Sequence, residues 1–142
     1  MANVGAWPID PLTPVGALRL EVGDTDGSPM LAPDDDKAEF QWFSDIELEA
    51  IYDAADGSAT RATGLAYRRI AVYLTIEATD IQSDDLRIRT IERAKAMREL
   101  ANDYINDAAA DDERAGAEIF GVAPYVRPGS RFTPEGSLGA LL

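Results

Sequence analysis

Hydrophobic residues recur at helical spacing in the two longest patterned segments of the chain. One covers roughly residues 84–110 and the other roughly residues 59–78. The apolar positions of the longer segment are Ile88, Ile91, Ala94, Met97, Ala101, Tyr104, Ile105 and Ala108. Those of the shorter segment are Ala62, Leu65, Ala66, Ile70, Tyr73, Leu74 and Ile76. The spacing predicts two long helices that each bury one face, and it places Leu65 and Ile91 in the core.

A third, shorter helix is predicted by the residues at its two ends. Ser44 is a favourable N-cap, and Glu47 three positions later completes a capping box that satisfies backbone N–H groups at a helix start. Asp56 and Gly57 provide a left-handed stop, so the helix covers about residues 45–55. Its narrow apolar face consists of Leu48, Ile51, Tyr52 and Ala55. That face must pack against another element.

The segments around these helices are rich in proline, glycine and aspartate. Residues 1–16 read as an extended N-terminal arm, residues 12–22 hold a possible short helix, and residues 23–37 read as an acidic loop. We therefore predict an all-α fold, a small bundle of three to four helices with extended N- and C-terminal arms. The helical domain covers residues 17–112, and residues 113–142 form the C-terminal arm.

Composition excludes several kinds of chemistry. The chain has 142 residues with no cysteine and no histidine, so disulfides, thiolate metal sites, cysteine nucleophiles and imidazole bases are excluded. No apolar run approaches the ~20 residues that a membrane-spanning helix requires. We expect one soluble, non-secreted domain without membrane contact and without enzymatic activity.

The net charge of −13 is unevenly distributed along the chain. Residues 1–56 carry 13 acidic and 2 basic side chains, which gives −11. Residues 57–98 carry 5 acidic and 8 basic side chains, which gives +3, and residues 99–142 carry 8 and 3, which gives −5. Because proteins bind nucleic acids largely through cations, this balance disfavours direct binding to DNA.

Two acidic motifs are weak candidates for a metal site. Residues 24–27, Asp-Thr-Asp-Gly, resemble the middle of a calcium loop, but with Gly27 at the turn the first ligand becomes Val22 and the bidentate acid becomes Pro33. A loop turn is the better interpretation. Residues 34–36, three consecutive aspartates, are more simply a solvated charge run. We assign no catalytic, cofactor-binding or metal-binding residue and no cofactor.

The basic residues of the long helix have two interpretations. Arg89 and Arg93 could pair with neighbouring acids such as Asp85 and Glu92. They could equally bridge to the acidic first block of the same or a neighbouring subunit. Because the first two blocks carry opposite charge, we expect contacts between neighbouring copies to depend on charge.

Five features taken together resemble a known family. They are the segment L-R-L-E-V-G-D-T-D at residues 18–26, the acidic loop after it, F-S-D-I-E-L-E-A-I-Y at residues 43–52, the helix at residues 67–76, and R-A-K-A-M-R-E-L-A at residues 93–101. In order and spacing they resemble the head-to-tail adaptor proteins, also called connector or head completion proteins, of long-tailed bacteriophages. The resemblance covers about residues 17–110.

The resemblance implies a structural virion protein located in the neck, at the head-tail interface, and assembled in the host cytoplasm. Such subunits form a ring, usually of twelve copies, with the portal protein above it and a stopper or tail-completion protein below it. Double-stranded DNA passes through the ring without specific binding. The family docks on the portal through its C-terminal portion, which here supplies Phe120, Tyr125 and Phe132. An alternative is an acidic helical interaction or regulatory module of the DNA-mimic type, which would bind a basic protein.

Overall fold

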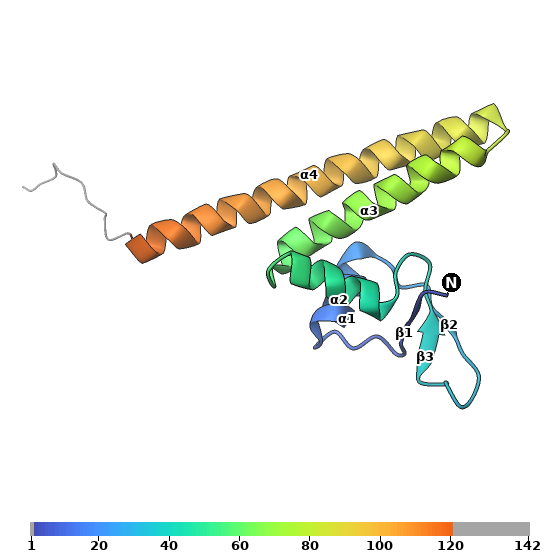
Figure 1. Ribbon diagram of the computed structural model, residues 1–142, viewed down its shortest axis with the longest axis horizontal. Coiled ribbons are helices and arrows are strands. Elements are labelled where there is room, and N and C mark those ends of the chain that lie inside the picture. Colours follow the sequence, from blue (N-terminus) through green and yellow to red (C-terminus); the bar gives the residue numbers. More distant parts are fainter. Residues whose placement is uncertain (1, 121–142) are drawn as a thin grey trace, which may run out of the picture. The chain divides into compact units, whose positions relative to one another are not determined.

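The computed structural model describes residues 2–120 and contains four helices and three short strands in that range. The chain divides into two compact units, Met1–Ala108 and Ala109–Leu142. In chain order the elements are β1 (Val4–Ala6), α1 (Pro14–Val22), β2 (Ser28–Pro29), β3 (Lys37–Glu39), α2 (Asp45–Ala54), α3 (Ala59–Asp80) and α4 (Asp84–Phe120) (Figure 1). The fold is mostly helical, as predicted, but the sheet shows that it is not purely α-helical.

The small sheet corrects two predictions made for the N-terminal region. Its order is β1-β3-β2 and both pairings are antiparallel, with Glu39 of β3 facing Val4 on one side and Ser28 on the other. The N-terminal arm is therefore tied to the domain, and the acidic loop contains a strand. Strands of two or three residues are too short to show an alternating pattern in the sequence, which is why the pattern did not reveal them.

The predicted short helix before Gly23 is α1. The Thr13 hydroxyl accepts a hydrogen bond from the backbone N–H of Gly16 at 3.0 Å, and Pro14 occupies the first turn, where no backbone donor is needed. The helix ends at Gly23 in a left-handed conformation with φ of 83°. Since α1 already begins at Pro14, the extended part of the arm is shorter than residues 1–16.

The predicted bounds and buried face of α2 are confirmed, but the capping box is only half formed, because the Glu47 carboxylate accepts from the Ser44 hydroxyl at 3.3 Å and not from the Ser44 backbone N–H. The Ser44 hydroxyl accepts a hydrogen bond from the backbone N–H of Glu47 at 3.2 Å. Asp56 and Gly57 follow the helix with φ of 54° and 76°. Leu48, Ile51 and Ala55 are buried and Tyr52 is partly buried. Residues 44–110 contain no strand, in agreement with the helical prediction for this range.

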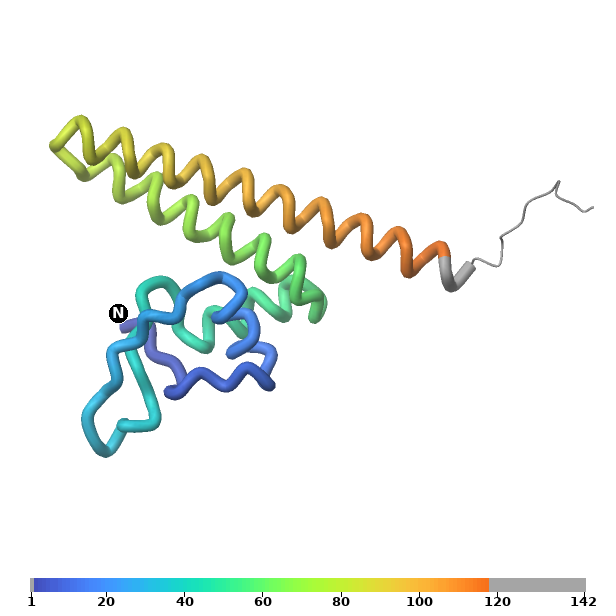
Figure 2. The backbone as a smooth tube through the Cα atoms, turned by 180° about the vertical axis from the view of Figure 1, so that it is seen from behind, coloured from blue at the N-terminus to red at the C-terminus, as the bar shows by residue number. Residues whose placement is uncertain are grey.

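Small residues form the seam between α3 and α4. The two helices run antiparallel along the part of α4 that lies in the first unit (Figure 1, Figure 2). The buried small residues on α3 include Gly64, Ala71 and Ala78, and those on α4 are Ala94, Ala101 and Ala108. Each set repeats every seven positions, the spacing that keeps one helix face toward a partner helix. Side chains this small allow the two backbones to approach closely.

The seam corrects the predicted core positions of α4. Ile91 is 41% exposed and Ile88 is also exposed, so both predictions of burial are wrong. Leu65 on α3 is partly buried and packs against the core. The reason is that alanine occupies the centre of the buried face of α4, and the larger apolar side chains on its flanks reach beyond the narrow contact with α3.

The helix α4 also extends further than the apolar pattern predicted. It continues to Phe120, so residues 113–120 are helical and not part of an extended arm. This stretch lacks an apolar stripe but contains two alanines, two glutamates and one arginine among its eight residues, which favour helix by intrinsic propensity. The rest of the predicted C-terminal arm, with Tyr125 and Phe132, lies outside the described residues.

Candidate interaction surfaces

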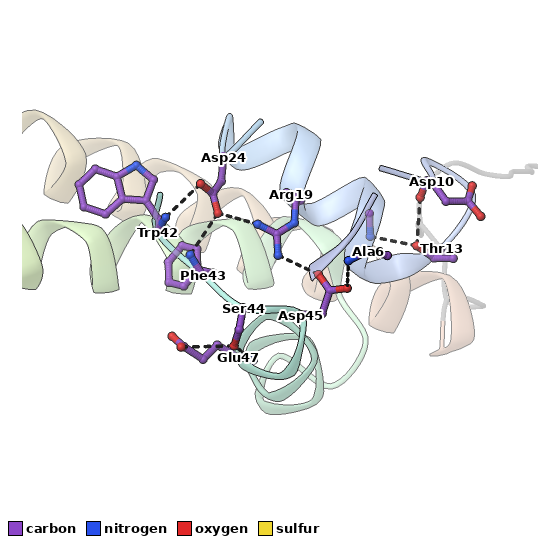
Figure 3. Close-up of polar contacts among 11 residues, drawn as sticks. Ala6, Asp10, Thr13, Arg19, Asp24, Trp42, Phe43, Ser44, Asp45 and Glu47 are labelled. Carbon is purple, nitrogen blue, oxygen red and sulfur yellow. Dashed lines mark hydrogen bonds and ion pairs between the residues drawn. The ribbon is translucent and has the colours of Figure 1, made fainter. Parts of the chain in front are cut away.

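A buried ionic network joins the two sequence segments at residues 18–26 and 43–52. Arg19 on α1 is 1% exposed, and its Nη1 lies 2.7 Å from Oδ2 of Asp24. Its Nη2 lies 2.8 Å from Oδ1 of Asp45, at the first position of α2 (Figure 3). The guanidinium also lies over the Phe40 ring, 3.7 Å from the ring centroid. Arg19 thus has two carboxylate partners and an aromatic face.

The two carboxylates of this network also bind the backbone. Asp24 accepts hydrogen bonds from the backbone N–H groups of Trp42 and Phe43, both at 3.1 Å. Asp45 accepts one from the backbone N–H of Ala6 at 2.8 Å. The network therefore fastens α1, the start of α2 and the sheet to one another (Figure 3). Its role is structural, and it places Asp24 in the interior instead of in a calcium loop.

The remaining acidic residues do not form a recognisable ion site. In the part of the chain that the structure describes, no group of three or more acidic side chains is arranged to hold a metal ion. Asp34 pairs with Lys37 at 3.0 Å, and the hydrogen bond to Asp34 raises the pKa of the Lys37 ammonium above its ordinary value. Asp35 and Asp36 are exposed. Between residues 2 and 120, no helix combines the length and the apolar character needed to cross a membrane.

Residues 57–98, which carry a net charge of +3, include several cations that have no acidic partner among the residues that the structure describes. Within residues 2–120, Arg89 and Arg93 form no ion pair with Asp85 or Glu92, so the pairing proposed for them within the chain is wrong. Arg87 instead pairs with the acid three positions before it, at 3.3 Å. Pairing of Arg89 and Arg93 with a neighbouring copy stays a prediction.

Exposed apolar side chains accompany these cations on the α3–α4 hairpin. They are Val72, Tyr73 and Ile76 on α3 and Leu86, Ile88, Ile91 and Leu100 on α4. Single exposed apolar residues are ordinary. The spacing on α4 places Leu86 and Leu100 on one flank of the seam and Ile88 and Ile91 on the other, so both flanks of the hairpin offer apolar area to another protein.

A shallow groove lies between α2 and α3, with a volume of about 390 Å³. Its apolar lining residues are Ala50, Ile51, Ala54, Leu65 and Val72. Arg68 and Arg69 line it as well, and neither forms an ion pair among the residues that the structure describes. The groove therefore combines an apolar lining with positive charge.

Two tyrosines and one glutamate link α1 to the hairpin. The Tyr104 hydroxyl donates to Oε2 of Glu21 at 2.9 Å, and the Tyr67 hydroxyl donates to the Glu21 backbone carbonyl at 3.3 Å. The two ring centroids are 5.7 Å apart. The hydrogen bond to Glu21 raises the pKa of Tyr104, and burial, followed by the Glu21 charge, raises the pKa of Tyr67.

Replacing Glu21 with glutamine is expected to lower the pKa of Tyr104 toward the ordinary tyrosine value. Because the phenol pKa values are raised in the folded state, the stability that this cluster contributes is fully present at pH values below the ordinary tyrosine pKa. It is lost as the pH rises through the folded-state pKa. Near-ultraviolet absorbance during alkaline titration reports tyrosinate formation. The matched Glu49→Gln variant, which changes an exposed carboxylate on α2, should leave the titration unchanged. Identical titration curves for Glu21→Gln and Glu49→Gln would contradict the hydrogen bond from Tyr104 to Glu21.

Comparison of the chain with protein family models, with curated proteins and with solved structures finds no match. A functional assignment therefore depends on the charge, apolar exposure and rigidity of the surfaces described above.

Proposed function

We propose that this chain is the subunit of a ring that serves as a head-to-tail adaptor in the neck of a long-tailed bacteriophage. The ring sits between the portal protein and a stopper or tail-completion protein and extends the DNA channel. The subunit acts as a scaffold and performs no catalytic step. Two properties support this proposal, namely the surface of the α3–α4 hairpin and the buried network.

The hairpin surface is the observation that carries the proposal. Exposed apolar side chains such as Ile76, Leu86 and Ile88 lie on the same two helices as Arg89 and Arg93, which have no acidic partner within residues 2–120. A subunit that stays alone leaves these apolar groups in water, whereas a neighbour can cover them and neutralise the cations. Repeated contacts between identical subunits close into a ring when the rotation permits.

The buried network supports the same role by keeping the surfaces fixed. Arg19, Asp24 and Asp45 connect the residues that the resemblance singled out at 18–26 and 43–52. A ring transmits force between capsid and tail, so its subunits need surfaces that hold their geometry. The excess of exposed carboxylates also suits a channel through which DNA slides, because negative charge repels the phosphate backbone.

Mass measurement on the purified full chain tests the proposal. We expect a concentration-dependent shift from monomer to one closed species of defined mass in sedimentation velocity and native mass spectrometry. Negative-stain images of that species should show rings with an open centre. Duplex DNA added to the rings should not be retained at physiological ionic strength.

The acidic-module alternative predicts a different result. Such a protein stays monomeric at all concentrations and binds a polylysine probe tightly, with an affinity that falls as salt is added. A monomer that behaves in this way would overturn the adaptor proposal. Rings that bind polylysine only weakly would support it.

A further inference from the structure

The loop between β2 and β3 presents an apolar side chain beside a cluster of acids. Leu31 is 88% exposed, and Asp35 and Asp36 are exposed close to it in the chain. Figure 1 shows this loop extending away from the helices of the first unit. An isolated leucine held in water in this way is stabilised when it enters an apolar site.

The loop is held in a defined conformation by its own backbone. The Met30 N–H donates to the Lys37 carbonyl at 2.9 Å, the Asp34 N–H to the Leu31 carbonyl at 3.0 Å, and the Lys37 N–H to the Asp34 carbonyl at 3.1 Å. Because the loop is already ordered, binding through it requires little loss of conformational entropy.

The groove between α2 and α3 has the complementary chemistry. Its volume of about 390 Å³ accommodates a leucine side chain, and its apolar lining includes Ala54, Leu65 and Val72. Arg68 and Arg69 supply two positive charges without acidic partners in the described part of the chain. The loop places the apolar side chain of Leu31 next to negatively charged aspartates. The groove can bind this arrangement, because its apolar lining lies next to the positive charges of Arg68 and Arg69.

We propose that the β2–β3 loop of one copy binds in the α2–α3 groove of the next copy, with Leu31 on the apolar lining and Asp35 and Asp36 facing Arg68 and Arg69. This contact deepens the ring-forming role and rests on it. Charge complementarity favours a second copy as the occupant, since the loop supplies carboxylates and the groove supplies guanidinium groups.

The contact is heterologous, because the loop and the groove are different surfaces of one subunit. Each copy therefore uses its loop on one neighbour and its groove on the other. Heterologous contacts generate rings when they close and filaments when they do not, whereas a contact between identical patches stops at a dimer. The contact thus has the geometry that ring closure requires, and it acts beside the contact made through the hairpin surface.

Cysteine cross-linking provides a direct test, because the chain contains no cysteine of its own. One copy carries Ala32→Cys in the loop, next to the retained Leu31, and a second copy of different mass carries Ala54→Cys in the groove. Mixing them under mild oxidation should produce the mixed disulfide in preference to either homodimer. The matched control replaces the loop variant with Ala17→Cys, an exposed alanine on α1, and should produce none.

Charge reversal gives a second measurement that does not require a disulfide. In the cross-linking pair, Arg68→Glu with Arg69→Glu on the groove copy should reduce the mixed disulfide to the control level. Adding Asp35→Lys with Asp36→Lys on the loop copy should restore it, because the two charges are exchanged. Circular dichroism confirms that the variants remain folded.

The possible outcomes separate this contact from the proposed function. Rings that form while the mixed disulfide stays at the control level would overturn the contact and leave the adaptor proposal standing. A mixed disulfide that reversal of Arg68 and Arg69 does not reduce would also overturn the pairing. Absence of both rings and cross-link would overturn both proposals.

Discussion

Replacing Asp24 with alanine is expected to lower the free energy of unfolding by about 3–5 kcal/mol, the usual range for removing one partner of a buried ion pair. The variant leaves the guanidinium of Arg19 in the interior with Asp45 as its remaining acid, and the Asp45 side chain is 35% exposed. It also removes the acceptor for the backbone N–H groups of Trp42 and Phe43. Denaturant unfolding followed by circular dichroism measures the loss.

Two further variants separate the ion pair from a general effect of losing an aspartate. Asp26→Ala changes an exposed acid two positions away and should alter stability by less than about 0.5 kcal/mol. The double variant Arg19→Met with Asp24→Asn removes both charges and keeps an oxygen that can accept from the backbone. It should lose less than Asp24→Ala, because no unpaired charge stays buried. Equal losses for Asp24→Ala and Asp26→Ala would contradict the buried-network assignment.

Replacing Gly64 with valine is expected to lower the free energy of unfolding by about 1–3 kcal/mol through overpacking. A Cβ atom at Gly64 would lie 2.8 Å from Cγ1 of Ile105 and 3.0 Å from the carbonyl oxygen of Ala101. The second contact is with backbone, so it is relieved only if α4 moves away from α3. Thermal unfolding of the variant measures this effect.

The matched control uses Gly116, a glycine inside α4. A Cβ at Gly116 meets nothing within 4 Å, so Gly116→Ala should not destabilise the chain. In an open helix position, alanine in place of glycine stabilises by roughly 0.5–1 kcal/mol. Gly64→Ala should not show this gain. If Gly64→Ala stabilises the chain as much as Gly116→Ala does, α3 and α4 are not in close contact at Gly64.

The network and the seam together explain how the proposed interaction surfaces are held in place. Arg19 fixes the start of α2, which forms one wall of the groove, and the Asp45 carboxylate fixes β1 beside β3. The loop that follows β2 is thereby attached to the same compact unit. We therefore expect variants of the network to weaken assembly as well as stability.

Local features of the sequence were sufficient to predict the helices. Capping by Ser44, the left-handed stop at Asp56 and Gly57, and apolar spacing over residues 59–78 depend on neighbours within a few positions of the chain. Such interactions can be read directly from sequence. Helix α4 runs beyond its predicted end, because the apolar spacing fails after Asp111 whereas helix propensity continues the helix through Gly116 to Phe120.

Only the tertiary structure decided which partners distant residues would find. The sequence segments at residues 18–26 and 43–52 meet through Arg19, Asp24 and Asp45, which are up to 26 positions apart. The three strands are too short to leave a pattern, and β1 pairs with β3 across the whole of α1 and β2. Ile91 is exposed because alanines occupy the centre of the buried face of α4. The physical reason is that the hydrophobic pattern of a sequence records only how apolar each position is. Whether a position is buried depends on which other element of the fold packs against it.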